Sequence, residues 1–450
     1  MAHKAIEILS PLIFFAASIP IFNKLYGTTQ SVIDEEFHLR QGLHYCHKRF
    51  SEWDPKITTF PGLYIASIIV IPFDMCNVYG LRLVSLLAST CNVYLIFKIR
   101  ERATPLQRNS LVLAIESMSI SLLPPLYFFS HLYYTDVLSM TFFLAMYYYW
   151  SKRSHGISAI FGAFSVLVRQ TNIVWVVLLL GVCFLDELIE MYAYRKGIKR
   201  KSTISLCSVK TIASIASSWG VVLQSIVNTL KLFYGYITVM VVFVAFVVSN
   251  GSIVVGDKSA HEATLHVPQI FYFGLFTLIF GAPVLFEKAR ETLRTLTKSK
   301  KFYAASLIIF LIVVRYNTMA HPYLLADNRH YTFYIWNRFY GKYEWFRFVI
   351  VPLYVLALKV IQLSMAHLSS GFQLMFWVSC FTALCCQKLL EVRYFLIPFM
   401  ILRLNLKIRN RRYIIFELVW NLSINILTFM IFFKKEIYWS NYSEPQRIIW

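Results

Sequence analysis

Charged side chains are scarce in this sequence, and acidic ones are the scarcest. Only 15% of the 450 residues are charged and 58% are hydrophobic, whereas soluble domains have about 25% charged and about 45–50% apolar residues. This composition excludes an ordinary soluble domain. The apolar residues form blocks of about 20, long enough to cross a bilayer as helices. Because the blocks are apolar all round, alternating barrel strands are excluded, and we predict an all-α polytopic membrane protein.

Paired cysteine motifs are also missing. None of the eight cysteines forms C-x-x-C, and most lie in or beside apolar blocks. We therefore interpret them as packing residues and expect neither a disulfide framework nor a zinc site. They are Cys46, Cys76, Cys91, Cys183, Cys207, Cys380, Cys385 and Cys386.

Basic residues gather in five short loops between apolar blocks, and they give a net charge of +21 from 44 basic and 23 acidic residues. Loops rich in Lys and Arg mark the cytosolic side of a membrane protein. Without a basic helix or zinc-finger spacing, we expect no nucleic-acid partner. All five loops share one side if the first of about thirteen spans starts in the cytosol. The spans lie near 5–22, 79–97, 110–128, 137–150, 156–168, 173–188, 232–249, 267–286, 302–319, 346–361, 373–390, 394–406 and 413–433.

The chain is expected to form one membrane-embedded domain over 1–450, since it has no internal repeat and no low-complexity linker. The first apolar segment lacks a small-residue cleavage site, so we expect a retained span and not a removed signal peptide. The stretch 61–73 is too short for an easy span and is expected to be interfacial or re-entrant. Region 189–231 is expected to be a cytosolic loop with an amphipathic helix. The main lumenal loops are then 23–61, 250–266 and 320–345.

Three adjacent carboxylates, Asp34, Glu35 and Glu36, directly follow the first span. Like charge and loss of water near a membrane tend to raise a carboxyl pKa, as a general base requires. The alternative interpretation is a solvated acidic start to a surface helix. A Trp53-Asp54-Pro55 segment and a Pro-Gly turn close the same loop, and this position favours a functional site.

Charges also lie at span ends on the side opposite the basic loops. Asp136 follows a Tyr-Tyr-Thr sequence at the end of one span, and Arg169 precedes Gln-Thr-Asn between two others. Such charges usually have a partner, so an ion pair between Asp136 and Arg169 and a role in a site are both open interpretations. Between two late spans, Glu391 and Arg393 form a second candidate pair, and Arg393 is placed to meet a lipid phosphate.

The loop at 250–266 contains Asp257, His261, Glu262 and His266. Zinc-binding helices need two histidines four residues apart, on one face. His261 and His266 are five apart and out of phase. We therefore expect no metal site here and assign these residues to hydrogen bonding with sugars.

The loop at 320–345 combines cationic and aromatic residues. Arg329 and His330 could hold a phosphate, because the guanidinium group suits bidentate contact. The aromatics, Trp336 among them, could stack on sugar rings. The alternative is an aromatic membrane interface with a snorkelling arginine.

Six motifs occur in order along nearly the whole chain. They are Asp34-Glu35-x-Phe37-His38, Trp53-Asp54-Pro55-x-Ile57-Thr58-Thr59-x-Pro61-Gly62-Leu63-Tyr64, Tyr133-Tyr134-Thr135-Asp136, Arg169-Gln170-Thr171-Asn172-Ile173, Gly256-Asp257-x-Ser259-x-His261-Glu262-Ala263 and Leu324-Leu325-Ala326-Asp327-Asn328-Arg329-His330-Tyr331-Thr332-Phe333-Tyr334. Together they resemble the dolichyl-phosphate-glucose-dependent α-1,2-glucosyltransferase family. Two positions beside the first motif depart from the family pattern: Glu36 stands at a usually apolar position, and Arg40 at a usual proline.

The resemblance implies a type C glycosyltransferase fold in the endoplasmic reticulum membrane, with its active site facing the lumen. The implied reaction is an inverting transfer of the third, terminal glucose of the N-glycan precursor. Its partners would be the donor dolichyl phosphate-glucose, the dolichyl-diphosphate-linked oligosaccharide acceptor and membrane lipid, with no cofactor and no metal.

An inverting transfer needs one base and several cationic groups around the leaving phosphate. By analogy with related lipid-carrier transferases, Asp34 is the expected base, with Glu35 second. The expected phosphate-binding residues are Arg329, His330 and Arg393, then Arg169. The candidates for holding sugars are His38, Asp136, Asp257, His261, Glu262, Asp327 and Trp336. The competing interpretations are a transporter or channel-associated protein without catalysis, which repeat symmetry would favour, and a non-catalytic membrane chaperone.

Overall fold

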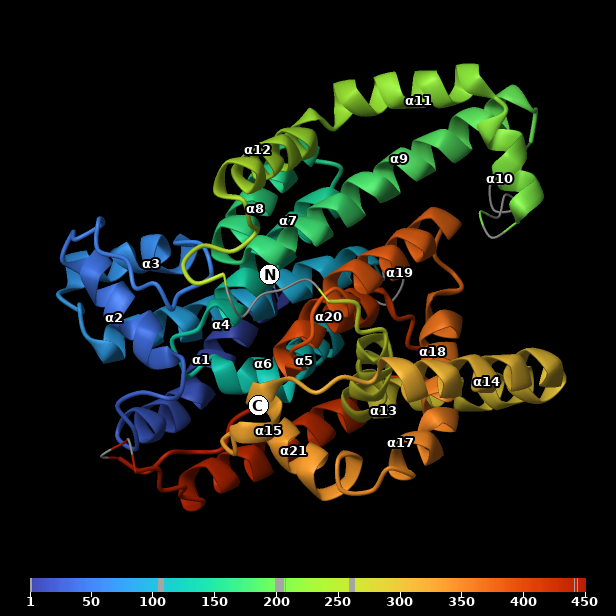
Figure 1. Cartoon of the computed structure of the whole chain (residues 1–450). Coiled ribbons are helices and arrows are strands. Elements are labelled where there is room, and N and C mark those ends of the chain that lie inside the picture. Colours follow the sequence, from blue (N-terminus) through green and yellow to red (C-terminus); the bar gives the residue numbers. More distant parts are fainter. Residues whose placement is uncertain are drawn as a thin grey trace.

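The computed structural model of the chain describes residues 2–103, 109–198, 206, 208–258, 264–440, 442 and 444–450. Over these ranges the protein is built from helices and loops, with two isolated β-bridges and no strand (Figure 1). This confirms the all-α architecture predicted from the apolar blocks.

A helix lies at each of the thirteen predicted spans, and the third and the tenth of them are each divided into two helices. By length and composition, six helices in the described part of the chain could cross a membrane, and a seventh span is formed if α11 and α12, bent by 86°, count as one. The helices are α1 (Ala2–Tyr26), α4 (Val78–Ala103), α5 (Ser110–Ser121) with α6 (Pro124–Phe129), α7 (Thr135–Ser151), α8 (His155–Val168), α9 (Ile173–Arg195), α12 (Tyr234–Asn250), α13 (Pro268–Lys298), α14 (Lys300–Asn317), α18 (Val351–Met365), α19 (Ser370–Cys385), α20 (Leu396–Asn405) and α21 (Arg412–Lys434).

Short helices fill the loops between these segments. The first loop contains α2 (Glu35–Cys46), and the stretch at 61–73 forms α3 (Gly62–Ser67) and the 3-10 helix η1 (Ile68–Phe73). In Figure 1, α2 and α3 lie together beside the bundle. The described residues of region 189–231 form the end of α9, then α10 (Val209–Ala216) and α11 (Trp219–Leu232), and α11 runs alongside α9. The loop at 320–345 contains α15 (Pro322–Ala326), α16 (Tyr331–Ile335) and the π-helix η4 (Trp336–Tyr340), and α17 (Phe346–Val349) follows.

A proline in α13 explains how α21 packs on it. Pro283 has no N–H, so the carbonyl of Ile279 loses its partner within the helix. The indole Nε1–H of Trp420, in α21, donates to that carbonyl at 2.8 Å. The side chain that fills the gap therefore also joins the two helices.

A buried ion network holds four helices together at one end of the bundle. The guanidinium of Arg403 in α20 donates to both carboxylate oxygens of Glu417 in α21, at 2.7 Å each, and to Glu116 in α5 at 2.9 Å. Arg100 in α4 lies 3.0 Å from the same Glu116 carboxylate. All four side chains are at most 3% exposed. Two positive and two negative charges cancel, so the network is tolerable at membrane depth.

The last residues of the chain run back along the loop that contains Arg329. The amide of Ile449 donates to the carbonyl of Arg329 at 2.8 Å, and the amide of Tyr331 donates to the carbonyl of Ile449 at 3.1 Å. The Trp450 ring lies 4.7 Å from the Tyr331 ring. The C-terminus therefore lies near α15 (Figure 1) and fixes this loop.

Candidate active site

Three helix junctions, far apart in sequence, meet around one carboxylate. Asp136, at the start of α7, forms an ion pair with Arg169, which lies between α8 and α9. Its other oxygen lies 3.4 Å from Arg393, at the junction before α20. Arg393 also lies 2.7 Å from Glu391. The two ion pairs that the sequence left as open interpretations, Asp136–Arg169 and Glu391–Arg393, are therefore present, and they join into one cluster.

The cluster lines a small pocket and is partly covered by aromatic rings. The Arg393 guanidinium lies 5.3 Å from the ring centres of both Phe129 and Tyr134. The Asp136 side chain is 1% exposed, whereas the Arg169 and Arg393 side chains are 17% and 12% exposed. The cations thus remain accessible from the pocket. Its lining residues include Ser139, Thr171, Asn172, Trp175, Gln387 and Tyr394.

Asp34 lies next to this cluster, directly before α2, and its side chain is exposed. Within the described ranges no hydrogen bond or ion pair holds its carboxylate, and it does not cap the helix that it precedes. Surrounding protein displaces part of its hydration shell and raises its pKa; the positive charge of Arg393 opposes this, and the negative charge of Glu391 reinforces it. His330 and Arg329 also act on it electrostatically. An accessible carboxylate with a raised pKa is suited to accepting a proton.

Glu35, the second candidate base, lies in a different environment. Its carboxylate is fully buried and pairs with Arg82 of α4, whose Nε and Nη2 donate to the two oxygens at 2.8 and 2.7 Å. The backbone amides of Val32 and Tyr133 donate to the same carboxylate at 3.1 and 2.7 Å. Four donors leave no room for a substrate hydroxyl. The geometry therefore contradicts a catalytic role for Glu35 and gives it a structural one.

Sequence reasoning missed Arg82, although a signal was present. It lies inside an apolar block, where a charged side chain needs a partner. Besides Glu35, Arg82 donates to the carbonyls of Thr29 and Gln30, at 3.2 and 3.1 Å. Ile33, between these contacts, has a φ of 53°, a conformation that β-branched residues rarely adopt. The contacts of Arg82 before and after Ile33 hold this turn in place, and they thereby fix the orientation of Asp34.

His38 follows one turn later in α2, beside the same cluster. Its Nδ1 lies 2.7 Å from the Tyr64 hydroxyl. Burial, reinforced by the positive charges of Arg393 and Arg169, lowers the pKa of His38 to about 4, while Asp136 opposes this shift. A neutral imidazole at physiological pH is able to hydrogen-bond a sugar, the role predicted for His38, but it adds no charge for a phosphate.

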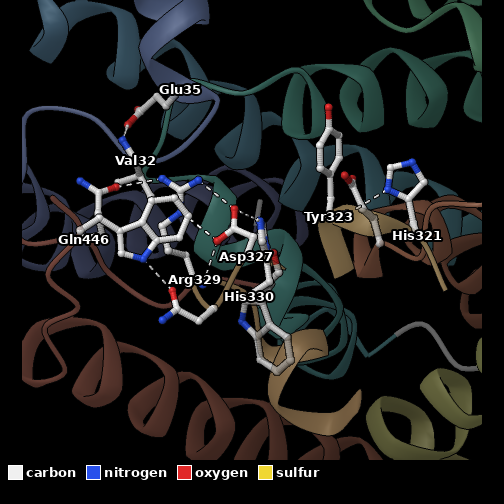
Figure 2. Close-up of polar contacts among 12 residues, drawn as sticks. Val32, Glu35, His321, Tyr323, Asp327, Arg329, His330 and Gln446 are labelled. Atoms are coloured by element: carbon white, nitrogen blue, oxygen red, sulfur yellow. Dashed lines mark hydrogen bonds and ion pairs between the residues drawn. The ribbon is translucent and has the colours of Figure 1, made fainter. Parts of the chain in front are cut away.

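Arg329 is occupied by protein partners (Figure 2). It donates to both carboxylate oxygens of Asp327, at 2.9 and 2.8 Å, and to Gln446 at 3.1 Å. Its guanidinium lies 4.2 Å from the Trp439 ring centre. These contacts occupy both edges and one face of the Arg329 guanidinium. Arg329 therefore holds its own loop against the C-terminal segment. The expectation that Arg329 binds phosphate directly, and Asp327 a sugar, is not supported by this geometry.

The remaining candidates differ in their placement. His330 is partly exposed, with Nδ1 3.3 Å from the Trp450 carbonyl. Trp336 is only 8% exposed and packs against Tyr340, so no free ring face is offered to a sugar. Asp257 lies in an exposed turn whose amide donates to the Pro55 carbonyl at 2.8 Å.

His261 and Glu262 lie outside the described residues, so the structure does not place them. Among the residues that it does place, no group of three or more His, Cys, Asp or Glu side chains could hold a metal ion.

Similar proteins match this chain over nearly its whole length. The sequence profile of the DIE2/ALG10 family matches residues 28–404. A Drosophila melanogaster protein named Dol-P-Glc:Glc(2)Man(9)GlcNAc(2)-PP-Dol alpha-1,2-glucosyltransferase is 45% identical over 445 residues, 99% of each chain. Proteins of the same name from Homo sapiens and Arabidopsis thaliana are 37% and 30% identical; the human one covers 93% of both chains, and the plant one 93% of this chain and 94% of its own. No solved structure matches the chain.

Proposed function

The chain belongs to the DIE2/ALG10 family, and from this premise we propose that it adds the third, terminal α-1,2-linked glucose to a lipid-linked oligosaccharide. The protein is a membrane glucosyltransferase that uses dolichyl phosphate-glucose. The acceptor would be the diglucosylated oligosaccharide on dolichyl diphosphate named for the relatives. The site would face the lumen of the endoplasmic reticulum, on the side opposite the basic loops.

The observation that carries this proposal is the meeting of Asp34, an acid without an ion pair to any described residue, with a cluster of accessible cations. Asp34 would remove the proton from the acceptor 2-hydroxyl while that oxygen attacks the anomeric carbon of glucose. Dolichyl phosphate would leave from the opposite face, so the β-linked donor gives an α-linked product in one step.

The leaving phosphate would be met by Arg393 and Arg169. Both guanidinium groups are held in place by acids, Glu391 and Asp136, yet both line the pocket with part of their surface accessible. Fixed cations that need no reorganisation stabilise charge that develops on a leaving oxygen. His330 would assist from the next loop, while Arg329 would act indirectly by holding that loop. No step of this reaction requires a metal or a further cofactor.

Reconstituted full-length protein tests the proposal. With labelled dolichyl phosphate-glucose and the diglucosylated acceptor, we expect one glucose to be added in an α-1,2 linkage, identified by linkage-specific digestion or NMR. A β-linked product would refute the inverting mechanism. Equal transfer to acceptors with none or one glucose would refute the assignment to the terminal step.

A further inference from the structure

Three cations lie close together in the segment from η4 to α17, outside the site described above. They are Arg338, Lys342 and Arg347, and the segment 336–347 that contains them is called the cationic turn from here on. The Nε of Arg347 donates to the carbonyl of Tyr340 at 2.9 Å. This contact closes the turn and holds Arg347 beside the segment that carries Arg338 and Lys342.

Aromatic rings, and not carboxylates, are the neighbours of these cations. The charges of Arg338 and Lys342 lie 5.5 and 5.3 Å from the centres of tyrosine rings, and Arg347 lies 5.7 Å from the centre of a tryptophan ring. Within the described ranges none of the three forms an ion pair, and neither does Glu344, the single acid of the cationic turn. Three basic side chains and one acidic one leave the turn with a net charge of +2.

The cationic turn lies where the chain enters the membrane. The segment Phe346–Met365, which begins inside the turn, is long and apolar enough to cross a bilayer. Phe339 and Trp345 are exposed large aromatic side chains, and aromatic residues at the end of a span lie at the level of the lipid headgroups. Arg338 and Lys342, which are exposed in the same turn, are therefore at the level of lipid phosphates.

The turn is also at the same end of the bundle as the active site. The rings of Trp336 and Tyr340 pack against Leu390, and the next residue, Glu391, belongs to the active-site cluster. They pack as well against Tyr272, near the start of α13, whereas a basic loop follows the far end of that helix. Basic residues concentrate on the cytosolic side of membrane proteins. Three cations without acidic partners at the opposite end therefore indicate an anionic ligand.

We propose that the cationic turn binds the diphosphate that joins the acceptor oligosaccharide to dolichol. The inference rests on the proposed function, which supplies this acceptor. The name of the relatives has a diphosphate between the glycan and the lipid. A diphosphate on a lipid carrier lies at the headgroup level, as the turn does, and the negative charge on each of its two phosphate groups matches the net charge of the turn. The donor phosphate is met separately, by Arg393 and Arg169.

Binding at the turn would select acceptors that are still attached to their carrier. The terminal sugar of the acceptor would reach Asp34 while the diphosphate is held by Arg338, Lys342 and Arg347. Once one end of the acceptor is bound, binding of the other end becomes intramolecular, which raises the overall affinity. The three cations would therefore act on the KM for the acceptor and leave the chemical step unchanged.

A double variant, Arg338→Gln with Lys342→Gln, tests the proposal. Both side chains are exposed and have no ion pair to a described residue, so the melting temperature should stay unchanged. The matched control is Lys300→Gln with Lys301→Gln, which removes two exposed charges from the opposite end of the bundle. Transfer is measured with the dolichyl-diphosphate-linked acceptor and with the same oligosaccharide released from its carrier.

We expect the double variant to raise the KM for the lipid-linked acceptor by about 10-fold or more, as the loss of a charged hydrogen bond does. Its kcat, its KM for the released oligosaccharide and its KM for the donor should match those of the wild type. The control variant should match the wild type in every constant. The charge-preserving variant Arg338→Lys with Lys342→Arg should keep the lower KM, which separates loss of charge from damage to the fold.

A binding measurement tests the same contact without glucose transfer. Purified full-length wild type and the control variant should retain radiolabelled dolichyl diphosphate, and Arg338→Gln with Lys342→Gln should retain much less. An excess of phosphatidylserine should not displace the label. Displacement would show a general site for anionic headgroups and would overturn the proposal.

The kinetic results that would overturn the proposal are an unchanged KM for the lipid-linked acceptor, an equal rise for both acceptors, or a rise in the KM for the donor. Retention of dolichyl diphosphate by a protein that depends on Arg338 and Lys342 but transfers no glucose would count against the proposed function alone. Glucose transfer with the same KM and the same retention in wild type and double variant would count against the diphosphate site alone.

Discussion

Replacing Asp34 and Glu35 in turn by the corresponding amides distinguishes an effect on catalysis from an effect on folding. Asp34→Asn removes the proposed base but breaks no hydrogen bond or ion pair within the described ranges. General-base catalysis contributes about 10²–10⁴-fold to a rate. We therefore expect kcat for glucose transfer to fall by about that factor, with unchanged protein yield and melting temperature.

Glu35→Gln acts in the opposite way. Its carboxylate accepts four hydrogen bonds, two of them from the fully buried Arg82. The neutral amide leaves that guanidinium buried without a counter-charge. Removing one partner of a buried ion pair costs about 3–5 kcal/mol, so the yield of folded protein and the melting temperature should drop.

The assay measures both properties on the same preparations. Wild type and both variants are solubilised in one detergent, their thermal unfolding is followed by intrinsic fluorescence, and transfer is measured in microsomes containing equal amounts of chain. The reasoning would be refuted by a Glu35→Gln variant that melts like the wild type yet loses transfer, together with an Asp34→Asn variant that retains it. That pair of results would assign the base to Glu35.

Four further outcomes follow from the geometry. Because its raised pKa keeps Asp34 protonated to a higher pH than an ordinary aspartate, kcat/KM should fall on acidification above the usual pKa of about 3.9; a profile flat to that pH would contradict this. Arg393→Lys loses the guanidinium fork and, at about 1.5–3 kcal/mol for a charged hydrogen bond, should slow transfer about 10–100-fold at normal stability; wild-type rates would exclude Arg393 from phosphate binding. Arg329→Lys loses the paired contact with Asp327 and should lower the melting temperature; slower transfer at unchanged stability would restore its phosphate-binding role. Finally, EDTA should leave transfer unchanged, and a loss restored by a divalent ion would refute a metal-free reaction.

Much of the fold follows from sequence because the bilayer restricts the choice of structure. Long apolar blocks predicted helices at the positions where helices lie, and the basic loops placed Asp136, Arg169 and Arg393 at one end of the bundle, where they meet. Successive spans cross the membrane in alternating directions, so the order of the spans alone predicts at which end of the bundle a residue lies. This prediction does not depend on which helices are neighbours.

The choice between Asp34 and Glu35 could not be made in this way. Successive residues at a helix N-terminus point about 100° apart, so one carboxylate faces α4 and its neighbour does not. Which one meets Arg82 depends on how α2 packs on α4, a contact between segments far apart in the chain. Arg329 is the converse case: its main partner, Asp327, is only two residues away, and this proximity was the available sign that its charge was already compensated.

The pairing of charges around the site explains why one acid is left to react. A base that formed a tight ion pair with an arginine would have a lowered pKa and a carboxylate pinned away from its substrate. Here nearby arginines each have another carboxylate as partner, and even Glu36, beside the base, pairs with Arg40 at 3.1 Å. The pairs are Glu35–Arg82, Asp136–Arg169, Glu391–Arg393 and Asp327–Arg329. The positive charge of Arg393 thus acts on Asp34 without an ion pair between the two side chains. A bound donor phosphate would compensate part of the positive charge of Arg393 and so weaken the effect of Arg393 on Asp34. The pKa of Asp34 would then rise further, and donor binding itself would make Asp34 a stronger base.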